Sequence, residues 1–257
     1  MKVVLFCGGQ GMRLRDYDDS IPKPMVTIGY RPIIWHLMKY YAHYGHKDFV
    51  LCLGYKADVI KNYFLNYNEA LSNDFVLADG GNKVELLHSD IHDWRITFVD
   101  TGATSTIGER LRQVRSHVAG EEMFLANYTD CLTDLNLETY LARFRAKNRV
   151  ASFVTVAPNV SFHYVTASDG LVTSLTDVRS TQLRVNGGFF AFKQEIFDQL
   201  REGEELVDGP FHRLMQAQQL MAYEYDGFWK AMDTFKDKQQ LDDLLARGNP
   251  PWEVWRR

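Results

Sequence analysis

The residues best suited to chemistry lie near the amino terminus, in a glycine-rich segment that follows a short apolar run. The segment and the proline-flanked lysine after it contain Gly8, Gly9, Gln10, Gly11, Met12, Arg13 and Lys23. Glycines at the carboxyl end of a strand let backbone N–H groups approach phosphate oxygens, because no Cβ stands in the way. Arg13 and Lys23 add positive charge that suits a phosphate. The pattern indicates a phosphate-binding loop, although the spacing alone also fits a surface turn with both cations in water.

Two familiar phosphate-binding loops do not match this spacing. A dinucleotide-binding fingerprint requires a third glycine where Leu14 stands, and a Walker loop requires a Gly-Lys-Ser/Thr sequence that the segment lacks. If the loop binds phosphate, it therefore does so in a different way from these two sites.

The elements that position this loop alternate between strand-like and helix-like patterns. Strands are expected over residues 3–7, 49–53, 94–99, 123–126, 150–157, 189–192 and 221–225, with two shorter ones around Tyr164 and Val172. Helices are expected from Pro32, across 59–67 and 107–118, from a cap at Asp134, and from Thr234 to a stop at Gly248. The alternation predicts a parallel sheet with helices on its faces, a hairpin at its edge within 73–87, and one domain spanning 1–257.

The composition limits the class of partner. The chain has 257 residues, of which 46% are hydrophobic and 24% charged, and such a composition is globular rather than disordered. Lys and Arg total 29 against 33 Asp and Glu, which gives a formal net charge of −4. We therefore expect no nucleic-acid partner and no attraction to an anionic membrane surface.

The cysteines and the apolar runs indicate the compartment. Cys7, Cys52 and Cys131 are too few and too widely spaced for a disulfide framework or a thiolate zinc site. The run at 3–7 is too short for a signal peptide, and no stretch approaches the ~18 apolar residues of a membrane span. We expect a cytoplasmic protein.

Several further motifs occur in a fixed order after the glycine loop. They are Arg31-Pro32-Ile33-Ile34-Trp35-His36, Leu53-Gly54-Tyr55-Lys56, Val99-Asp100-Thr101-Gly102, Gly108-Glu109-Arg110-Leu111, Val185-Asn186-Gly187-Gly188-Phe189-Phe190 and Gly227-Phe228-Trp229-Lys230-Ala231-Met232-Asp233-Thr234. In this order the chain resembles the sugar-phosphate nucleotidyltransferases over nearly its full length. The resemblance implies a three-layer α/β fold, Rossmann-like, with a mixed and mostly parallel sheet. It also implies transfer of a nucleotidyl group, CMP from CTP in particular, to a sugar 1-phosphate such as glucose 1-phosphate, with release of pyrophosphate.

The resemblance also implies roles for individual residues. Asp130 and Asp233 would hold Mg²⁺, although an aspartate at either place also suits a turn or a helix cap. The glycine loop with Gln10 would contact the nucleotide, and Arg13 and Lys23 would neutralise its phosphates. The remaining assignments are Arg110 for the nucleotide and Asn186, Gly187, Gly188 and Arg179 for the sugar phosphate.

Two motifs depart from the family pattern. Thr129 and Cys131 flank Asp130 where glycines are usual, and their side chains would narrow a place of close approach. Val178 replaces a lysine that contacts the sugar phosphate, leaving Arg179 or Arg184 as neighbouring cations. These departures keep open a different phosphorylated acceptor, another nucleotide, or a homologue that binds without turnover.

The carboxyl terminus suits an intermolecular or an intramolecular contact. Trp252 and Trp255, followed by Arg256 and Arg257, fit either a subunit interface or packing against the same domain. We expect a homo-oligomer.

Overall fold

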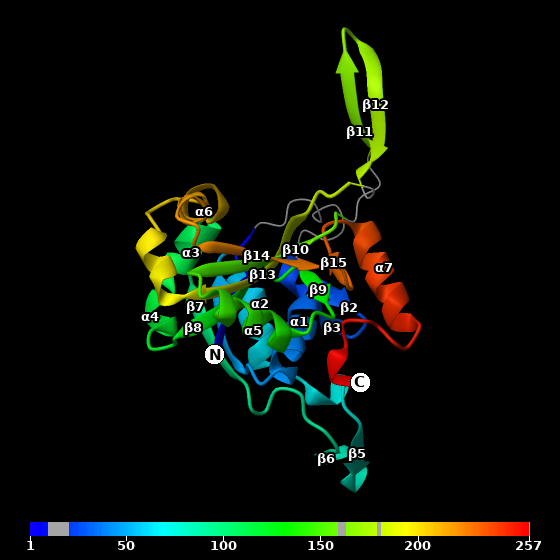
Figure 1. Ribbon diagram of the computed structural model, residues 1–257. Helices are drawn as coiled ribbons and strands as arrows, with labels where there is room; N and C mark the ends of the chain where they lie inside the picture. Colours follow the sequence, from blue (N-terminus) through cyan, green and yellow to red (C-terminus); the bar gives the residue numbers. More distant parts are fainter. Residues whose placement is uncertain (10–20, 159–162, 179–180, 257) are drawn as a thin grey trace.

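The structure is a computed structural model that describes residues 1–9, 21–158, 163–178 and 181–256 (Figure 1). Within these ranges, seven strands form one sheet in the order β14-β10-β13-β8-β1-β4-β7. Along the chain these strands are β1 (Lys2–Phe6), β4 (Asp48–Leu53), β7 (Arg95–Asp100), β8 (Met123–Asn127), β10 (Ala151–Val156), β13 (Val185–Lys193) and β14 (Leu220–Tyr225). Each strand expected from the apolar patterns in these places is confirmed.

The sheet is mixed and mostly parallel. Strand β1 lies parallel to β4 and β8, β4 lies parallel to β7, and β10 lies parallel to β14. Strand β13 runs antiparallel to both of its neighbours, β8 and β10. The carboxyl ends of the parallel strands and the start of β13 therefore meet at one edge of the sheet, which is where open α/β sheets place their ligands.

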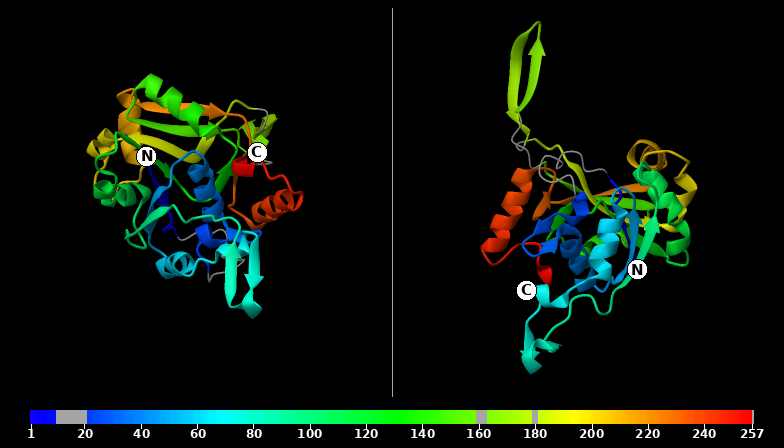
Figure 2. Two further views of the ribbon diagram at one scale, coloured as in Figure 1. Left: turned by 90° about the horizontal axis from the view of Figure 1, so that it is seen from below. Right: turned by 180° about the vertical axis from the view of Figure 1, so that it is seen from behind.

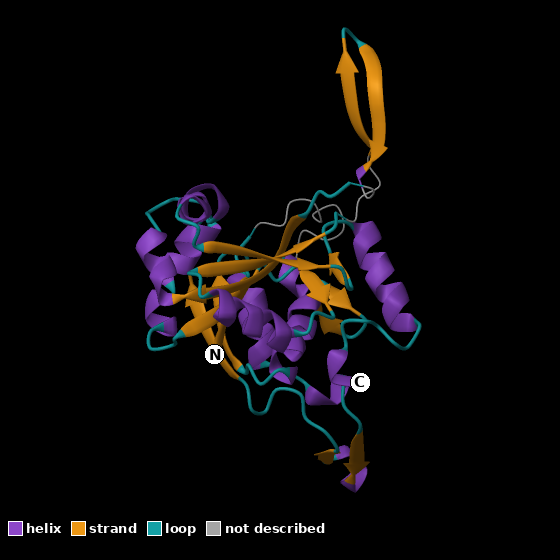
Figure 3. Cartoon of the chain, viewed as in Figure 1, coloured by secondary structure: helices purple, strands orange, loops and turns teal. Residues whose placement is uncertain are grey.

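Helices cover both faces of this sheet (Figures 2 and 3). They are α1 (Ile33–His43), α2 (Ala57–Leu65), α3 (Ile107–Gln113), α4 (Arg115–Val118), α5 (Leu137–Lys147), α6 (His212–Gln216) and α7 (Phe235–Ala246). Side chains alternate along β1, so Val3 and Leu5 pack with α1 and α5, whereas Val4 and Phe6 pack with α3 and α4. The chain thus has the expected three layers, helix, sheet and helix.

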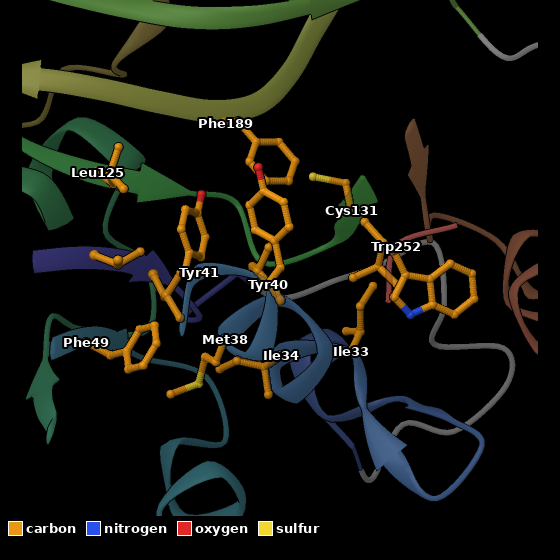
Figure 4. Packing of buried hydrophobic residues seen from close by; sticks show 14 of the residues in the cluster. Ile33, Ile34, Met38, Tyr40, Tyr41, Phe49, Leu125, Cys131, Phe189 and Trp252 are labelled. Atoms are coloured by element: carbon orange, nitrogen blue, oxygen red, sulfur yellow. The ribbon is translucent and has the colours of Figure 1, made fainter. Parts of the chain in front are cut away.

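Helix α1 supplies much of the larger core. Its buried residues include Ile33, Ile34, Met38, Tyr40 and Tyr41, and Figure 4 shows them beside strand residues such as Phe49, Leu125 and Phe189. Trp252 closes one end of this core and is 1% exposed, so this carboxyl-terminal tryptophan packs back on its own chain. This finding favours packing against the same domain over a subunit interface, the two roles considered for the carboxyl terminus.

Two hairpins project from the sheet and pair only with themselves among the described residues. They are β5 (Phe75–Ala78) with β6 (Lys83–Leu86), and β11 (His163–Ser168) with β12 (Leu171–Asp177) (Figure 1). The hairpin expected within 73–87 therefore exists, but its place at the edge of the main sheet was wrong. Its strands carry exposed side chains and find no partner in the strand β7 at that edge.

Shorter pairs complete the described structure. Strand β2 (Thr27–Ile28) pairs with β3 (Arg31–Pro32), and β9 (Cys131–Thr133) pairs with β15 (Trp229–Ala231). In the described part of the chain, no helix has the length and apolar character that crossing a membrane requires.

Two predicted caps had different outcomes. Asp134 does not cap α5, because Asn136 is the residue whose side chain accepts a hydrogen bond from the backbone of Thr139. The Asp134 carboxylate instead accepts from the backbone N–H of Phe228 at 2.8 Å, which ties it to the segment before β15. The cap at Thr234 is confirmed, since Thr234 and Asp237 form a reciprocal capping box at the start of α7.

Candidate functional site

A cavity of about 320 Å³ opens at the carboxyl edge of the sheet. It lies where β1 and β8 end, beside the short helical turn Lys23–Met25. Its lining residues are Phe6, Cys7, Gly9, Lys23, Pro24, Ile107, Tyr128, Thr129 and Asp130. This cavity therefore brings together four residues that the sequence analysis singled out: Gly9, Lys23, Thr129 and Asp130.

The Lys23 ammonium bridges the two aspartates predicted to hold a metal. Its Nζ donates to Asp130 Oδ2 at 2.8 Å and to Asp233 Oδ1 at 2.6 Å. These residues are far apart in the sequence, since Asp130 lies 107 positions after Lys23 and Asp233 lies 210 positions after it. The fold thus gathers one cation and two anions at the wall of the cavity.

The strand pair β9–β15 explains why the two aspartates meet. Ala231 pairs with Cys131 in this antiparallel ladder, and the backbone N–H of Met232 donates to the Asp130 carbonyl at 2.8 Å. This backbone bond extends the ladder by one position, so that Asp130 lies opposite Met232 and Asp233 comes next in the chain. The side chains of Asp130 and Asp233 therefore reach the same ammonium. Thr234 caps α7 in its own right, and the Asp233 carboxylate is thereby free of the capping role that the sequence left open.

The electrostatic surroundings keep Lys23 charged. Burial alone lowers the pKa of Lys23, but the charges and hydrogen bonds of Asp130 and Asp233 outweigh burial, so its pKa lies above the ordinary lysine value. Side-chain exposure is 14% for Lys23, against 28% for Asp130 and 41% for Asp233. The carboxylates are thus open to an incoming ligand, while the ammonium lies largely beneath them.

Thr129 occupies a backbone conformation that usually requires glycine. Its φ is +66° although its side chain is β-branched and fully buried, a combination that is rare in proteins. Two hydrogen bonds hold it there: its N–H donates to Asn127 Oδ1 at 2.8 Å, and its hydroxyl donates to Phe6 O at 2.8 Å. The same hydroxyl also lies close to Tyr128 O. The residue therefore keeps the sharp turn into Asp130 despite the departure from the family's glycine.

Cys131 does not narrow the cavity. Its thiol is 1% exposed and donates to the Gly187 carbonyl at 3.3 Å, away from the lining residues. The Trp229 indole N–H donates to the same carbonyl at 2.8 Å. Gly188, next in the chain, has a φ of +75°, and a Cβ there would lie 3.0 Å from the Tyr128 ring. The predicted sugar-binding segment is thus packed closely against the residues that flank Asp130.

Arg110 lies beneath the glycine loop rather than in the cavity. Its guanidinium is 1% exposed and donates to Gly8 O at 3.0 Å, to Leu53 O at 3.2 Å and to Thr101 Oγ1 at 2.7 Å. A Cβ at Gly8 would lie 2.0 Å from Arg110 Nη1. The predicted direct contact with the nucleotide is therefore replaced by another task, since the guanidinium joins the ends of β1, β4 and β7 and supports the start of the loop.

Asn186 joins the predicted sugar-binding segment to the cavity. Its amide donates to the Tyr128 hydroxyl at 3.4 Å, and its oxygen accepts from the Gly188 N–H at 2.9 Å. The Tyr128 ring lines the cavity and packs edge-on against Phe190 at 4.8 Å. Sequence reasoning missed Tyr128, although an aromatic residue placed between a buried strand and a candidate ligand aspartate was a usable signal.

Other predicted site residues lie outside the described residues or are engaged elsewhere. Gln10, Gly11, Met12, Arg13 and Arg179 fall outside the described ranges. Val178 is described, at the end of the β11–β12 hairpin segment. Arg184 is paired with Asp226 at 2.6 Å and donates to the Tyr225 carbonyl, so its guanidinium is committed to the β14 side of the sheet.

The donor set fits a magnesium ion bound together with a nucleotide. Mg²⁺ is usually held by one or two carboxylates plus substrate phosphates rather than by an all-protein cage. Asp130 and Asp233 supply two carboxylates, and the position between them already holds a cation, the Lys23 ammonium. Among the described residues, no group of three or more His, Cys, Asp or Glu side chains is arranged to hold a metal ion.

Comparison with known proteins places the chain in a family. A family model described as "Nucleotidyl transferase" matches residues 2–237, so the chain belongs to the nucleotidyl transferase family. It is 37% identical over 258 residues to the glucose-1-phosphate cytidylyltransferase of Salmonella typhi, with 99% of this chain and 100% of the relative covered. The resemblance found in the sequence motifs is thereby confirmed.

Solved structures confirm the Rossmann-like fold. A UDP-glucose pyrophosphorylase complexed with UDP-glucose superposes with a TM-score of 0.68 at 12% identity, covering 96% of this chain and 98% of that one. HddC from Yersinia pseudotuberculosis gives a TM-score of 0.67 at 17% identity, covering 95% and 99%. At these identities the likeness establishes the fold alone.

Proposed function

We propose that the protein transfers CMP from CTP to glucose 1-phosphate and releases pyrophosphate. The observation that carries this proposal is the meeting of Lys23, Asp130 and Asp233 at a cavity lined by Gly9. The choice of CTP and glucose 1-phosphate rests on the 37% identity, over essentially the whole chain, to an enzyme of that name.

The proposed reaction is an in-line displacement at the α-phosphorus of the nucleotide. An oxygen of the sugar phosphate attacks, one P–O bond forms, and the bond to the pyrophosphate leaving group breaks. A phosphate monoester has a second pKa of ~6, so the nucleophile is already largely dianionic at neutral pH and requires no strong general base. Catalysis then consists mainly of positioning and of stabilising charge.

Each residue of the site has a place in this proposal. Gly8 and Gly9, with Gln10, Gly11 and Met12, hold the nucleotide, and Lys23 and Arg13 neutralise its phosphates. Asp130 and Asp233 bind Mg²⁺, which would offset the negative charge of the two phosphorylated reactants. Arg110 acts as a positioning residue through Gly8, and Asn186, Gly187, Gly188 and Arg179 receive the sugar phosphate.

Val178 supports a second candidate within the same family, in which the acceptor is a different phosphorylated compound. The resemblance places this residue where the family has a lysine that contacts the sugar phosphate, and the neighbouring Arg184 is held by Asp226. A pyrophosphate-release screen that crosses the four NTPs with a panel of sugar 1-phosphates tests both candidates. Release with CTP and glucose 1-phosphate alone supports the first. Release only with another pair replaces it, and no release with any pair favours a homologue that binds without turnover.

We also propose a cytoplasmic homo-oligomer. All three cysteines are free and buried, and burial raises the pKa of Cys7 to about 12, as suits thiols kept reduced. The β11–β12 hairpin exposes Leu171, Val172 and Leu175 by 73%, 64% and 65%. An isolated two-stranded hairpin is marginally stable in water, so a second copy of the chain is the partner we assign to it.

A further inference from the structure

The Lys23 ammonium lies between the two aspartates, in the position that a metal ion bound by both carboxylates would occupy. Its nitrogen lies 2.8 Å from Asp130 Oδ2 and 2.6 Å from Asp233 Oδ1. Both carboxylate oxygens therefore point at one centre of positive charge, and that centre is part of the protein. A divalent cation held by the same two oxygens cannot occupy this place together with the ammonium, because like charges at such a distance repel.

The backbone of Lys23 is held in place by its neighbours in the chain. Pro22 and Pro24 flank it, the Met25 N–H donates to Pro22 O at 2.8 Å, and the Val26 N–H donates to Lys23 O at 3.2 Å. Pro24 and Met25 are buried. Any change of partner therefore consists of a rotation of the flexible lysine stem, which carries a mobile point charge.

The cavity offers the ammonium an alternative partner once a nucleotide is bound. Lys23, Gly9, Thr129 and Asp130 line the same space, so phosphate oxygens in that space lie within reach of Nζ. When the ammonium turns to a phosphate, the two carboxylates lose their cation and become available to a metal.

We infer that Lys23 acts as a built-in competitor of the divalent cation, so that the metal binds well only after nucleotide phosphates have drawn the ammonium away. This inference rests on the proposed function, because it takes Asp130 and Asp233 as the metal ligands. It adds that nucleotide and metal bind with positive coupling, and by thermodynamic reciprocity each raises the affinity for the other. The same lysine thus protects the ligand-free site against a metal bound without substrate.

The direct test measures metal binding without nucleotide. Mn²⁺ serves as the probe, and the free ion is measured by electron paramagnetic resonance during titration of wild type, Lys23→Met and Lys23→Arg. Coupling between binding sites commonly amounts to about 5–150-fold, so Lys23→Met should bind Mn²⁺ at least about tenfold more tightly than wild type. Lys23→Arg keeps a cation and should stay near wild type. Equal or weaker binding by Lys23→Met would overturn the inference.

A matched control separates this competition from net charge. Lys47 is also paired with an aspartate, Asp93, but it precedes β4 at the opposite edge of the sheet. Lys47→Met removes the same charge and should leave Mn²⁺ affinity unchanged. A gain equal to that of Lys23→Met would mean that general charge, not competition, controls binding. If Lys23→Met fails to fold, Lys23→Gln takes its place with the same expected gain.

Two further measurements distinguish failure of the inference from failure of the proposed function. Adding Asp233→Asn to Lys23→Met should abolish the gain; an unchanged gain would show that Asp233 is not a ligand, and the metal assignment itself would fall. The ratio of CTP affinities with and without Mn²⁺ should be severalfold larger in wild type than in Lys23→Met. Equal ratios, with Asp233 still required for Mn²⁺, would overturn the coupling alone.

Discussion

Asp233 and Thr234 are neighbours with separate tasks. The Asp233 carboxylate accepts from the Lys23 ammonium at 2.6 Å, whereas the Thr234 hydroxyl accepts from the N–H of Asp237 and caps α7. In the sequence either residue is a suitable helix cap. In the structure Thr234 caps the helix and Asp233 pairs with Lys23, so a substitution at either residue tests one of these roles alone.

Asp233→Asn tests the ligand role. Asparagine keeps the size of the side chain but removes the charge that a divalent cation selects, so turnover should be abolished and Mg²⁺-dependent nucleotide binding weakened. The thermal unfolding midpoint should hardly change, because Thr234 still caps the helix and the ion pair with Lys23 is partly exposed. Pyrophosphate release at wild-type rate from the purified variant would contradict the assignment.

Lys23→Ala tests the phosphate contact. Loss of one charge-assisted contact should cost about 1.5–3 kcal/mol of transition-state stabilisation, or roughly a tenfold to hundredfold decrease in kcat/KM. Steady-state kinetics on folded protein measure it. An unchanged kcat/KM would return Lys23 to the status of an ordinary paired surface lysine.

At the scale of elements, the strand ends are held together by a buried cation. Arg110, from α3, donates to groups that follow or end β1, β4 and β7. Gly8 leaves the space that its guanidinium fills, and a Cβ there would meet Nη1 at 2.0 Å. Gly8 therefore has a packing role besides its proposed place in the nucleotide loop, whereas Gly9 lines the cavity itself.

Gly8→Ala and Gly9→Ala should separate these two uses. Overpacking typically costs about 1–3 kcal/mol, so Gly8→Ala should lower the free energy of unfolding by an amount in that range. No described atom lies within 4 Å of a Cβ built at Gly9, so Gly9→Ala should change stability by only about 0.5 kcal/mol while weakening nucleotide binding. Chemical denaturation of both variants checks this. Equal stabilities would show that Arg110 moves aside without cost.

The cap of α7 gives a second test at this scale. Thr234→Ala removes the capping box and should lower the free energy of unfolding by about 1 kcal/mol. Turnover should largely persist, because the Asp233 carboxylate is retained. If Thr234→Ala abolished turnover without lowering stability, the assignment of the cap to Thr234 and of the ligand role to Asp233 would be wrong.

At the scale of the whole molecule, the main sheet joins strands from Lys2 to Tyr225 and carries an apolar core on each face. We therefore retain the prediction of one domain over 1–257. The β5–β6 and β11–β12 hairpins lie outside both cores (Figure 2). Both hairpins carry exposed apolar side chains, and the β11–β12 hairpin is where we place the proposed partner copy.

Charge placed on one hairpin tests the proposed assembly. Leu175→Lys puts a charge on an apolar position that is 65% exposed, and it should shift the sedimentation coefficient towards that of a monomer. Ser174→Lys, on the opposite face of β12, is the matched control and should have less effect. A wild-type protein that sediments as a monomer would rule out the homo-oligomer.

The sequence by itself determined the layers of the fold and singled out three candidate site residues that the structure brings together. Apolar runs and helical periodicities are local properties, so β1, β4, β8 and α1 were predictable where they stand. The order of the motifs singled out Lys23, Asp130 and Asp233. Lysine is a residue type that suits phosphate, and aspartate is one that suits a divalent metal. The structure differs from the sequence prediction in local details; for example, Asn136 rather than Asp134 caps α5.

Only the tertiary structure decided how those residues relate to one another. The pairing of β9 with β15, which joins residues about a hundred positions apart, brings Asp130 to Asp233 and both to Lys23. Arg110 was predicted as a nucleotide contact from its position in a family motif, whereas in the structure its guanidinium packs closely against Gly8 and Gly54. A residue's type fixes what its side chain is able to bind. Which partner it binds depends on long-range pairing and packing, and no local pattern of residues encodes these.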